Sequence, residues 1–194
     1  INGLSDSFHP CQALTDYFTV YEHRRDLSSV KLAFVGDGNN VANSLLLGAG
    51  LLGVNCSVAS PKGFLPDPEV VKQTKMLAAG TGVAIEVTES IDAAVKNADF
   101  LYTDVWVSMG SEKETAKRAK ALSKYRITRQ LIDRCAPGCM VMHCLPAHRG
   151  EEITDEAMDC PQSIVFDQAE NRLHFQKALM CSLMGGKKGA FPWI

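Results

Sequence analysis

The sequence predicts a three-layer, doubly wound α/β domain built on a mostly parallel sheet. Short apolar runs alternate with longer stretches of helical periodicity, which is the pattern of βαβ units. The chain has 194 residues, of which 46% are hydrophobic, and this is enough for one core with helices on both faces of the sheet. We therefore expect a Rossmann-like arrangement.

Each expected strand is a short apolar run that ends at a glycine or a polar residue. The six runs span residues 31–35, 55–59, 83–87, 100–104, 140–143 and 163–167. Helical patterns cover residues 10–26, 39–52, 68–79, 91–97, parts of 115–135, 154–158 and 169–184. Ser7 or His9 can cap the first helix, with Pro10 in its first turn. We expect one domain over residues 1–168, a C-terminal helix at 169–184 and a frayed tail at 185–194.

Charge and hydropathy argue against several kinds of partner. Lysine and arginine total 20 against 22 acidic residues, so neither nucleic acid nor an anionic membrane is expected. The longest apolar run, 41–54, is interrupted by Asn43, Ser44 and glycines, so no membrane span is predicted. Seven cysteines without regular spacing are typical of reduced thiols and favour a cytoplasmic protein. Because the chain opens on Ile1, we expect a piece of a longer protein. If the missing N-terminus carries a transit peptide, the protein would be located in an organelle matrix instead.

Polar side chains follow the ends of four expected strands. The segment 36–40 follows the first strand, Asp104 ends the fourth, Cys144 follows the fifth and Arg172 lies shortly after the sixth. Open α/β sheets bind ligands beyond the carboxyl ends of their strands. An amide, a carboxylate, a thiol and a guanidinium at one rim suit a small zwitterion that carries an additional amine.

A dinucleotide site is a competing interpretation of the first strand end. Gly36 and Gly38 occupy two positions of the nucleotide-binding fingerprint, but Val41 stands where its third glycine belongs. The second strand ends in 59–61, Ala-Ser-Pro, without the acidic residue that would bind a ribose. We expect the glycines to allow a tight turn that brings Asn40 to the rim, and we disfavour a nicotinamide oxidoreductase.

The cysteines near the fifth strand invite a metal interpretation. Cys135, Cys139 and His143 do not have the spacing of a structural zinc site, so we expect buried thiols and no metal. Cys144 has two interpretations: a thiol whose pKa a neighbouring histidine lowers, or a small buried residue before a turn. Asp104 is likewise either a ligand group or a turn residue.

Five short motifs follow one another along the chain. They are His9-Pro10-Cys11-Gln12, Gly36-Asp37-Gly38-Asn39-Asn40, Asp104-x3-Ser108-Met109-Gly110, His143-Cys144-Leu145-Pro146-Ala147-His148-Arg149-Gly150 and Glu170-Asn171-Arg172. In their order and spacing they resemble the ornithine carbamoyltransferases, within the aspartate/ornithine carbamoyltransferase family. The resemblance runs from residue 9 to about 184 and covers that family's C-terminal, ornithine-binding domain, with the final helix that returns to the first domain. The first domain, with its Ser-Thr-Arg-Thr phosphate loop, has no counterpart in the sequence.

The resemblance implies transfer of a carbamoyl group from carbamoyl phosphate to the δ-amine of L-ornithine, within arginine metabolism. It implies no metal or organic cofactor, a homotrimer, and a missing first domain as partner. Catalytic roles would fall to Cys144, Asp104, His9 and Arg172, with Asp104 and Cys144 orienting the amine and taking its proton. Ornithine would contact Asn40, Asp104, Ser108 and Met109, and carbamoyl phosphate would contact His9, Pro10, Cys11, Gln12, Cys144, Leu145 and Arg172.

Three further expectations concern the acceptor, the activity of the chain alone and the closing helix. Asp104 is acidic and residues 108–110 contain no Arg or Lys, which favours a cationic amino acid over aspartate. Without the phosphate loop, the chain alone is expected to be inactive and to bind ornithine poorly. The closing helix would then lack the surface on which it packs, leaving Leu173, Leu179, Met180 and Leu183 without their cover. The alternative is a non-catalytic amino-acid-binding module derived from the same domain.

Overall fold

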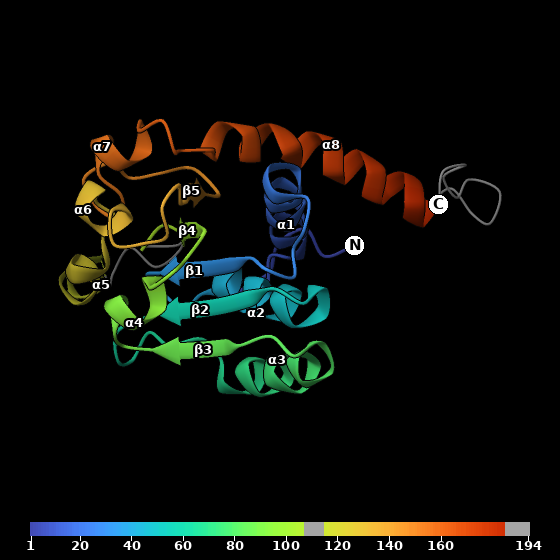
Figure 1. Cartoon of the computed structure of the whole chain (residues 1–194), viewed down its shortest axis with the longest axis horizontal. Coiled ribbons are helices and arrows are strands. Elements are labelled where there is room, and N and C mark those ends of the chain that lie inside the picture. Colours follow the sequence, from blue (N-terminus) through green and yellow to red (C-terminus); the bar gives the residue numbers. More distant parts are fainter. Residues whose placement is uncertain (107–114, 185–194) are drawn as a thin grey trace.

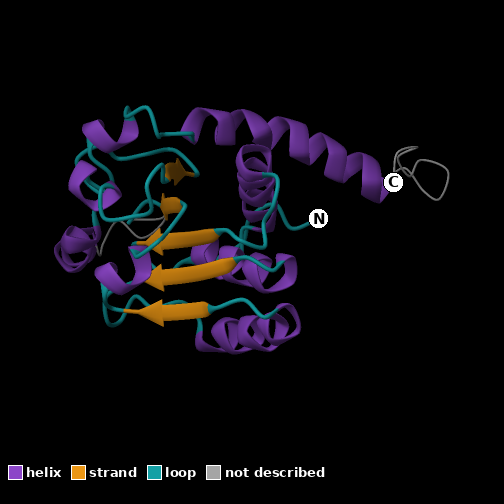
Figure 2. Cartoon of the chain, in the orientation of Figure 1, coloured by secondary structure: helices purple, strands orange, loops and turns teal. Residues whose placement is uncertain are grey.

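The computed structural model describes residues 1–106 and 115–184, and it confirms the predicted α/β class. One parallel sheet has the strand order β3-β2-β1-β4-β5. Figure 2 shows β1, β2 and β3 stacked with their arrows pointing the same way. The strands are β1 (Lys31–Val35), β2 (Asn55–Ala59), β3 (Ile85–Thr88), β4 (Phe100–Thr103) and β5 (Met140–His143).

Helices connect the strands and form the outer layers (Figure 1). The long helix α8 lies beside α1, and its far end extends past the rest of the domain. Within the described ranges, no helix combines the length and the hydropathy needed to cross a bilayer. The helices are α1 (Pro10–Arg24), α2 (Asn40–Leu52), α3 (Pro68–Thr81), α4 (Ile91–Val95), α5 (Thr115–Leu122), α6 (Arg129–Ile132), α7 (Asp155–Met158) and α8 (Val165–Met184), with a 3-10 turn η2 (Ser123–Tyr125).

Two hydrophobic cores lie on opposite faces of the sheet. In β1, Leu32 and Phe34 pack with residues of α1 and α2, whereas Ala33 and Val35 pack with residues of α4 and α6. Successive side chains of a strand point to opposite faces, so both sets are buried. This double burial explains why the strands appear in the sequence as continuous apolar runs.

The predicted strand at 163–167 is wrong. Ser163 makes one isolated bridge to Val141, and α8 begins two residues later at Val165. Ile164 and Val165 are both buried at this junction. A short apolar run has the same pattern in a strand and in a buried helical turn, so hydrophobic periodicity does not distinguish them.

The predicted helical material at 115–135 is divided into α5, η2 and α6. Arg126 has an extended backbone, and Ile127 bridges to Ile153, which ends the first helical part. Thr128 then caps α6 through its side chain.

The final helix leaves apolar side chains uncovered, as expected. Leu173, Met180 and Leu183 are exposed, and Leu179 is half-buried. The predicted tail at 185–194 lies outside the described residues.

The strand order defines where connections diverge. From β1 the chain continues to β2 and β3 on one side, and β4 and β5 occupy the other side. The carboxyl ends of β1 and β4 are therefore adjacent but are followed by connections that run apart. This is the position at which open α/β sheets form a binding crevice.

Gly38 permits a close backbone approach at this crevice, and its replacement tests that constraint. Its N–H donates to the carbonyl of Phe64 at 2.7 Å, and an added Cβ would lie 2.6 Å from that oxygen and nearer still to the backbone of Pro66. Gly38→Ala is expected to lower the free energy of unfolding by about 1–3 kcal/mol. Chemical denaturation measures this change.

The matched control is Gly80→Ala, which replaces a glycine of α3 with open space around it. Its stability is expected to stay equal or to rise by up to about 1 kcal/mol, because alanine favours helices. Equal stability of the two variants would contradict the close-approach argument.

Candidate functional site

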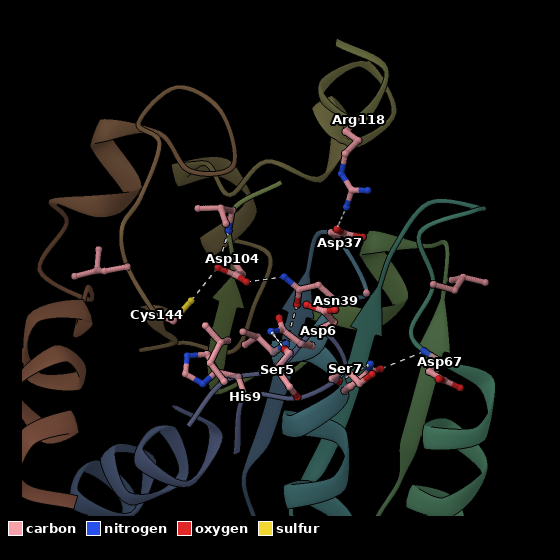
Figure 3. A pocket seen from close by; sticks show the side chains of 18 of the residues that line it. Ser5, Asp6, Ser7, His9, Asp37, Asn39, Asp67, Asp104, Arg118 and Cys144 are labelled. Carbon is pink, nitrogen blue, oxygen red and sulfur yellow. Dashed lines mark hydrogen bonds and ion pairs between the residues drawn. The ribbon is translucent and has the colours of Figure 1, made fainter. Parts of the chain in front are cut away.

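A cavity of about 1030 Å³ opens at the carboxyl ends of β1, β4 and β5 (Figure 3). Its walls come from the loops after these strands, the starts of α2 and α3, helix α5 and the segment before α1. The sequence-predicted residues on these walls are His9, Asn40, Asp104, Cys144 and Leu145. The structure therefore brings together groups that are far apart in the sequence.

Asp104 lies at the centre of a hydrogen-bonded chain across the strand ends (Figure 3). Its Oδ1 accepts a hydrogen bond from Sγ of Cys144 at 2.9 Å, and its Oδ2 accepts one from Nδ2 of Asn39 at 2.6 Å. Thr103 pairs with His143 across β4 and β5, which makes the next residue of each strand a neighbour. The side chain is thus held on both sides and is only 7% exposed.

Asn39 was not predicted as a site residue, although its motif was recognised. Its Oδ1 caps α2 by accepting from the backbone N–H groups of Val41 and Ala42 at 3.0 and 3.2 Å. An amide whose oxygen faces a helix start turns its NH2 group away, and here that group faces Asp104. Asparagine before a helix predicts the cap. The second contact depends on the adjacency of β1 and β4, which the local sequence does not encode.

Asn40 has a different role from Asn39 in the structure. Its Nδ2 donates to the carbonyl oxygen of Ser5 at 2.8 Å, which ties the segment before α1 to the cavity wall. The hydroxyl of Ser44 donates to the carbonyl of Asn40 and accepts from the backbone N–H of His9, each at 2.8 Å. The start of α2 therefore also positions His9.

The interpretation of Cys144 as a low-pKa thiol is wrong. Burial raises the pKa of this thiol well above its usual value, and the Asp104 carboxylate raises it further. His143 is directed elsewhere, because its Nδ1 accepts from the N–H of Leu145 at 2.8 Å and its Nε2 lies 3.0 Å from Glu152. Cys144 is therefore a protonated thiol that donates to Asp104.

His9 faces the cavity as a neutral imidazole. Burial, and then the positive charge of Arg172, lowers the pKa of His9. Within the described residues, the buried Nδ1 of this ring has no hydrogen-bond partner. A buried ring nitrogen without a partner is unusual in a folded protein, so His9 is set apart from the other buried polar side chains around it.

The other residues predicted to contact carbamoyl phosphate lie behind the cavity wall. Gln12 is 1% exposed, and its Oε1 accepts from Nη1 of Arg172. The Gln176 amide, with its oxygen toward Arg172, accepts from Nη2 and Nε at 3.0 Å each. Cys11 is buried and Pro10 begins α1. The structure thus places Pro10, Cys11, Gln12 and Arg172 close to the cavity but not among its lining residues.

A charged pair that the sequence did not identify also lines the cavity. Arg118 of α5 contacts Oδ2 of Asp37 (Figure 3). It also donates from Nε to the carbonyl of Trp106 at 2.8 Å and lies over the Phe64 ring. Burial raises the pKa of Asp37 to about 6, although Arg118 acts in the opposite direction. Asp37 lies in a recognised motif, whereas no local pattern marks Arg118.

The lining carries an excess of negative charge among the described residues. Four carboxylates face one guanidinium, that of Arg118. Clefts lined by one sign of charge concentrate ligands of the opposite sign. The lining therefore favours a cationic group. The four carboxylates are those of Asp6, Asp37, Asp67 and Asp104.

The loop after β5 shows backbone strain at Leu145. This residue has φ 58°, a conformation that is uncommon for residues other than glycine and that concentrates at functional sites. Ser108 and Met109, both predicted to contact ornithine, lie outside the described residues.

A metal could in principle use Asp104, His143 and Cys144, whose ligand atoms lie within 4.8 Å of one another. Both ring nitrogens of His143 are already engaged with Leu145 and Glu152. A carboxylate and a thiol remain, which is fewer than a structural zinc site needs. The same pair suits an amine, since the carboxylate is an acceptor for N–H groups.

Asn39→Asp tests the orientation of Asp104. The new carboxylate retains the cap but faces Asp104, and two close carboxylates raise the pKa of the pair. The folded variant then binds more protons than the unfolded chain above the ordinary aspartate pKa of about 3.9. Its free energy of unfolding is therefore expected to fall as pH rises from 5 to 8.

Asn39→Ser is the matched control, because serine also caps helices but does not extend to Asp104. The free energy of unfolding of Asn39→Ser is expected not to show this additional fall between pH 5 and pH 8. Denaturant unfolding of both variants at pH 5 and pH 8 measures the difference, and identical slopes would show that Asn39 does not face Asp104.

Comparisons with known proteins identify the same domain that the sequence motifs resemble. A family model described as "Aspartate/ornithine carbamoyltransferase, Asp/Orn binding domain" matches residues 28–183. The ornithine carbamoyltransferase of Thermococcus kodakarensis is 51% identical over 188 residues, which are 97% of this chain and 60% of the relative. That of Methanoculleus marisnigri is 56% identical over 186 residues, covering 96% of this chain and 59% of the relative.

A solved structure of ornithine carbamoyltransferase from Pyrococcus furiosus superposes with a TM-score of 0.91 at 49% identity, over 95% of this chain and 59% of that chain. The chain thus spans about 60% of the length of the curated relatives it matches. It belongs to the aspartate/ornithine carbamoyltransferase family, of which it contains the Asp/Orn binding domain.

Proposed function

We propose that this chain is the ornithine-binding part of an ornithine carbamoyltransferase, which makes citrulline and phosphate from L-ornithine and carbamoyl phosphate. The observation that carries the proposal is the Asn39–Asp104–Cys144 chain inside one negatively lined cavity. The names of the matched relatives support the same reaction. The acidic lining favours a cationic amino acid over aspartate as the acceptor.

Ornithine must lose a proton before it reacts. An alkylammonium has a pKa of roughly 10, so its nitrogen lone pair is occupied at neutral pH. We assign the orientation of the amine to Asp104 and Cys144, whose contacting atoms are 2.9 Å apart, so an amine that reaches one is within reach of the other. Asp104 accepts the proton, directly or through the Cys144 sulfur. Asn40, Ser108 and Met109 hold the amino-acid end.

The carbamoyl group then moves between two nucleophiles. The δ-nitrogen forms a bond to the carbamoyl carbon, the bond from that carbon to the phosphate oxygen breaks, and phosphate leaves with the proton that the nitrogen gives up. Negative charge develops on the carbonyl oxygen, which a positioned donor and a nearby cation stabilise. We assign these roles to His9 and Arg172, with Pro10, Cys11, Gln12, Cys144 and Leu145 completing the carbamoyl-phosphate contacts. The position of His9 on the cavity wall supports its assignment.

The proposal extends to partners and location. Carbamoyl phosphate carries two negative charges, and the chain lacks a phosphate loop that would neutralise them. We assign that loop to a first domain, and we assign the uncovered side chains of α8 to contact with it. We further propose that the complete protein forms a homotrimer and is located in the cytoplasm or in an organelle matrix. Unpaired thiols throughout the described cysteines are consistent with a reducing compartment.

The proposed reaction is tested by comparing the complete gene product with this chain. The complete protein is expected to form citrulline from ornithine and carbamoyl phosphate, and to prefer ornithine to aspartate. The 194-residue chain is expected to form no measurable citrulline. Turnover by the chain alone would contradict the need for a first domain. Carbamoylation of aspartate in preference to ornithine would contradict the substrate assignment.

Cys144→Ser in the complete enzyme tests the proton-transfer role. The hydroxyl is a different donor beside Asp104, so we expect kcat to fall by about tenfold or more and its pH dependence to shift. Cys160→Ser is the control, since this thiol donates to the carbonyl of Ala157 and is not a lining residue. An unchanged rate and pH profile for Cys144→Ser would defeat the assignment.

A further inference from the structure

A buried carboxyl group lies beneath the proposed site, in the interface between α1 and α8. Asp16 of α1 is 0% exposed. Its Oδ1 accepts from Nε2 of Gln12 at 2.7 Å and from Nε2 of Gln168 at 2.6 Å. Its Oδ2 accepts from the hydroxyl of Tyr102 at 2.9 Å. Asp16 thus connects α1, β4 and α8.

Gln12 connects Asp16 to Arg172. Because Nε2 of Gln12 donates to Asp16, its Oε1 must face the opposite way, and there it accepts from Nη1 of Arg172. Gln176 also contacts Arg172, but it lies on the same helix and cannot fix the guanidinium relative to α1. The Asp16–Gln12 contact therefore sets where the guanidinium lies.

Gln168 connects Asp16 to the end of β5. Nε2 of Gln168 donates to Asp16, and its Oε1 accepts from the backbone N–H of His143 at 2.9 Å. This N–H belongs to the residue directly before Cys144. One carboxyl group thus determines the orientation of two amides, and each amide holds a different wall of the site.

The spacing of these residues places them on the faces of α1 and α8 that contact each other. Gln12 and Asp16 are one turn apart on α1, and Gln168 and Arg172 are one turn apart on α8, so each pair shares a helix face. A buried carboxylate is unfavourable unless it is hydrogen-bonded. Burial raises the pKa of Asp16 to about 7, while the bonds from Gln12, Gln168 and Tyr102 lower it.

We propose that Asp16 is a positioning residue, which orients Arg172 through Gln12 and the Cys144 strand end through Gln168. The inference rests on the proposed function for its catalytic consequence, and on the contacts above for its structural part. Asp16 does not line the cavity, so its effect is exerted through the two glutamines.

Three variants of the complete enzyme test the proposal by steady-state kinetics. Asp16→Leu removes every acceptor, and we expect kcat to fall by about a hundredfold, the scale of a misplaced catalytic group. The KM for ornithine is expected to change by less than about threefold, because Asp104 keeps its hydrogen bond from Asn39, which does not depend on Asp16. Asp16→Asn retains an oxygen that both glutamines can reach, so its kcat is expected to stay within about tenfold of wild type.

The control is Tyr17→Phe, which removes a buried hydrogen bond from the adjacent residue of α1 to the carbonyl of Leu45. This variant is expected to lose stability without losing kcat. The proposal is overturned if Asp16→Leu retains its kcat, if its KM rises as steeply as kcat falls, or if Asp16→Asn is as impaired as Asp16→Leu.

If Asp16→Leu does not fold, Gln168→Met tests the effect on the Cys144 strand end separately from the effect on Arg172. It removes the contact to His143 while leaving the Gln12–Arg172 contact in place, and kcat is expected to fall by about tenfold with KM retained. An unchanged kcat would overturn the role of Gln168 and with it the proposal.

Crystal structures of the 194-residue chain provide a readout that does not depend on activity. Arg172 is expected to leave Gln12 in Asp16→Leu and to remain beside it in Asp16→Asn. An unmoved Arg172 in Asp16→Leu overturns the proposal. A wild-type complete enzyme that forms no citrulline would instead defeat the proposed function, and the crystal structures would still decide the positioning role.

Discussion

The site depends on the placement of β4 between β1 and β5 in a parallel sheet. This pairing places the residues after three strands side by side, so that Asp104 receives hydrogen bonds from Asn39 on one side and Cys144 on the other. A carboxylate that is 7% exposed needs such partners, since burial without them is unfavourable. The same two bonds fix its orientation toward the cavity. The strand order, the helix cap and the thiol therefore act together on one side chain.

Two groups of contacts organise the site, and they meet at the end of β5. Around the cavity, the start of α2 supplies Asn39 and Asn40, which orient Asp104 and the segment before α1. Behind the cavity, the α1–α8 interface supplies Gln12 and Gln168, whose amides meet at a buried carboxylate. The first group shapes a negatively lined cavity, and the second holds a guanidinium and the backbone at the end of β5. Under the proposed function, the first group would bind the cationic amino acid and the second would hold the cation that stabilises the developing negative charge.

Much of this arrangement was predictable from local sequence, because burial on both faces of a sheet leaves continuous apolar runs and turns follow them. The positions of His9, Asp104 and Cys144 at one cavity were predicted and are found there. The second role of Asn39 and the presence of Arg118 were not, because both depend on contacts between segments that are distant in sequence. The sequence left two interpretations of Cys144 open for the same reason: only the structure shows that His143 turns toward Glu152 and that the thiol faces an acid. The strand proposed at 163–167 failed because Ile164 and Val165 are buried at a helix start.

The most direct test is a crystal structure of the complete enzyme with L-ornithine bound. We expect ornithine to lie in the cavity at the ends of β1, β4 and β5, with an amino nitrogen within about 3.2 Å of the Asp104 carboxylate. We also expect the Asn39–Asp104 hydrogen bond to persist in that complex. Ornithine bound elsewhere, or bound in this cavity with neither amino group near Asp104, would contradict the proposed function.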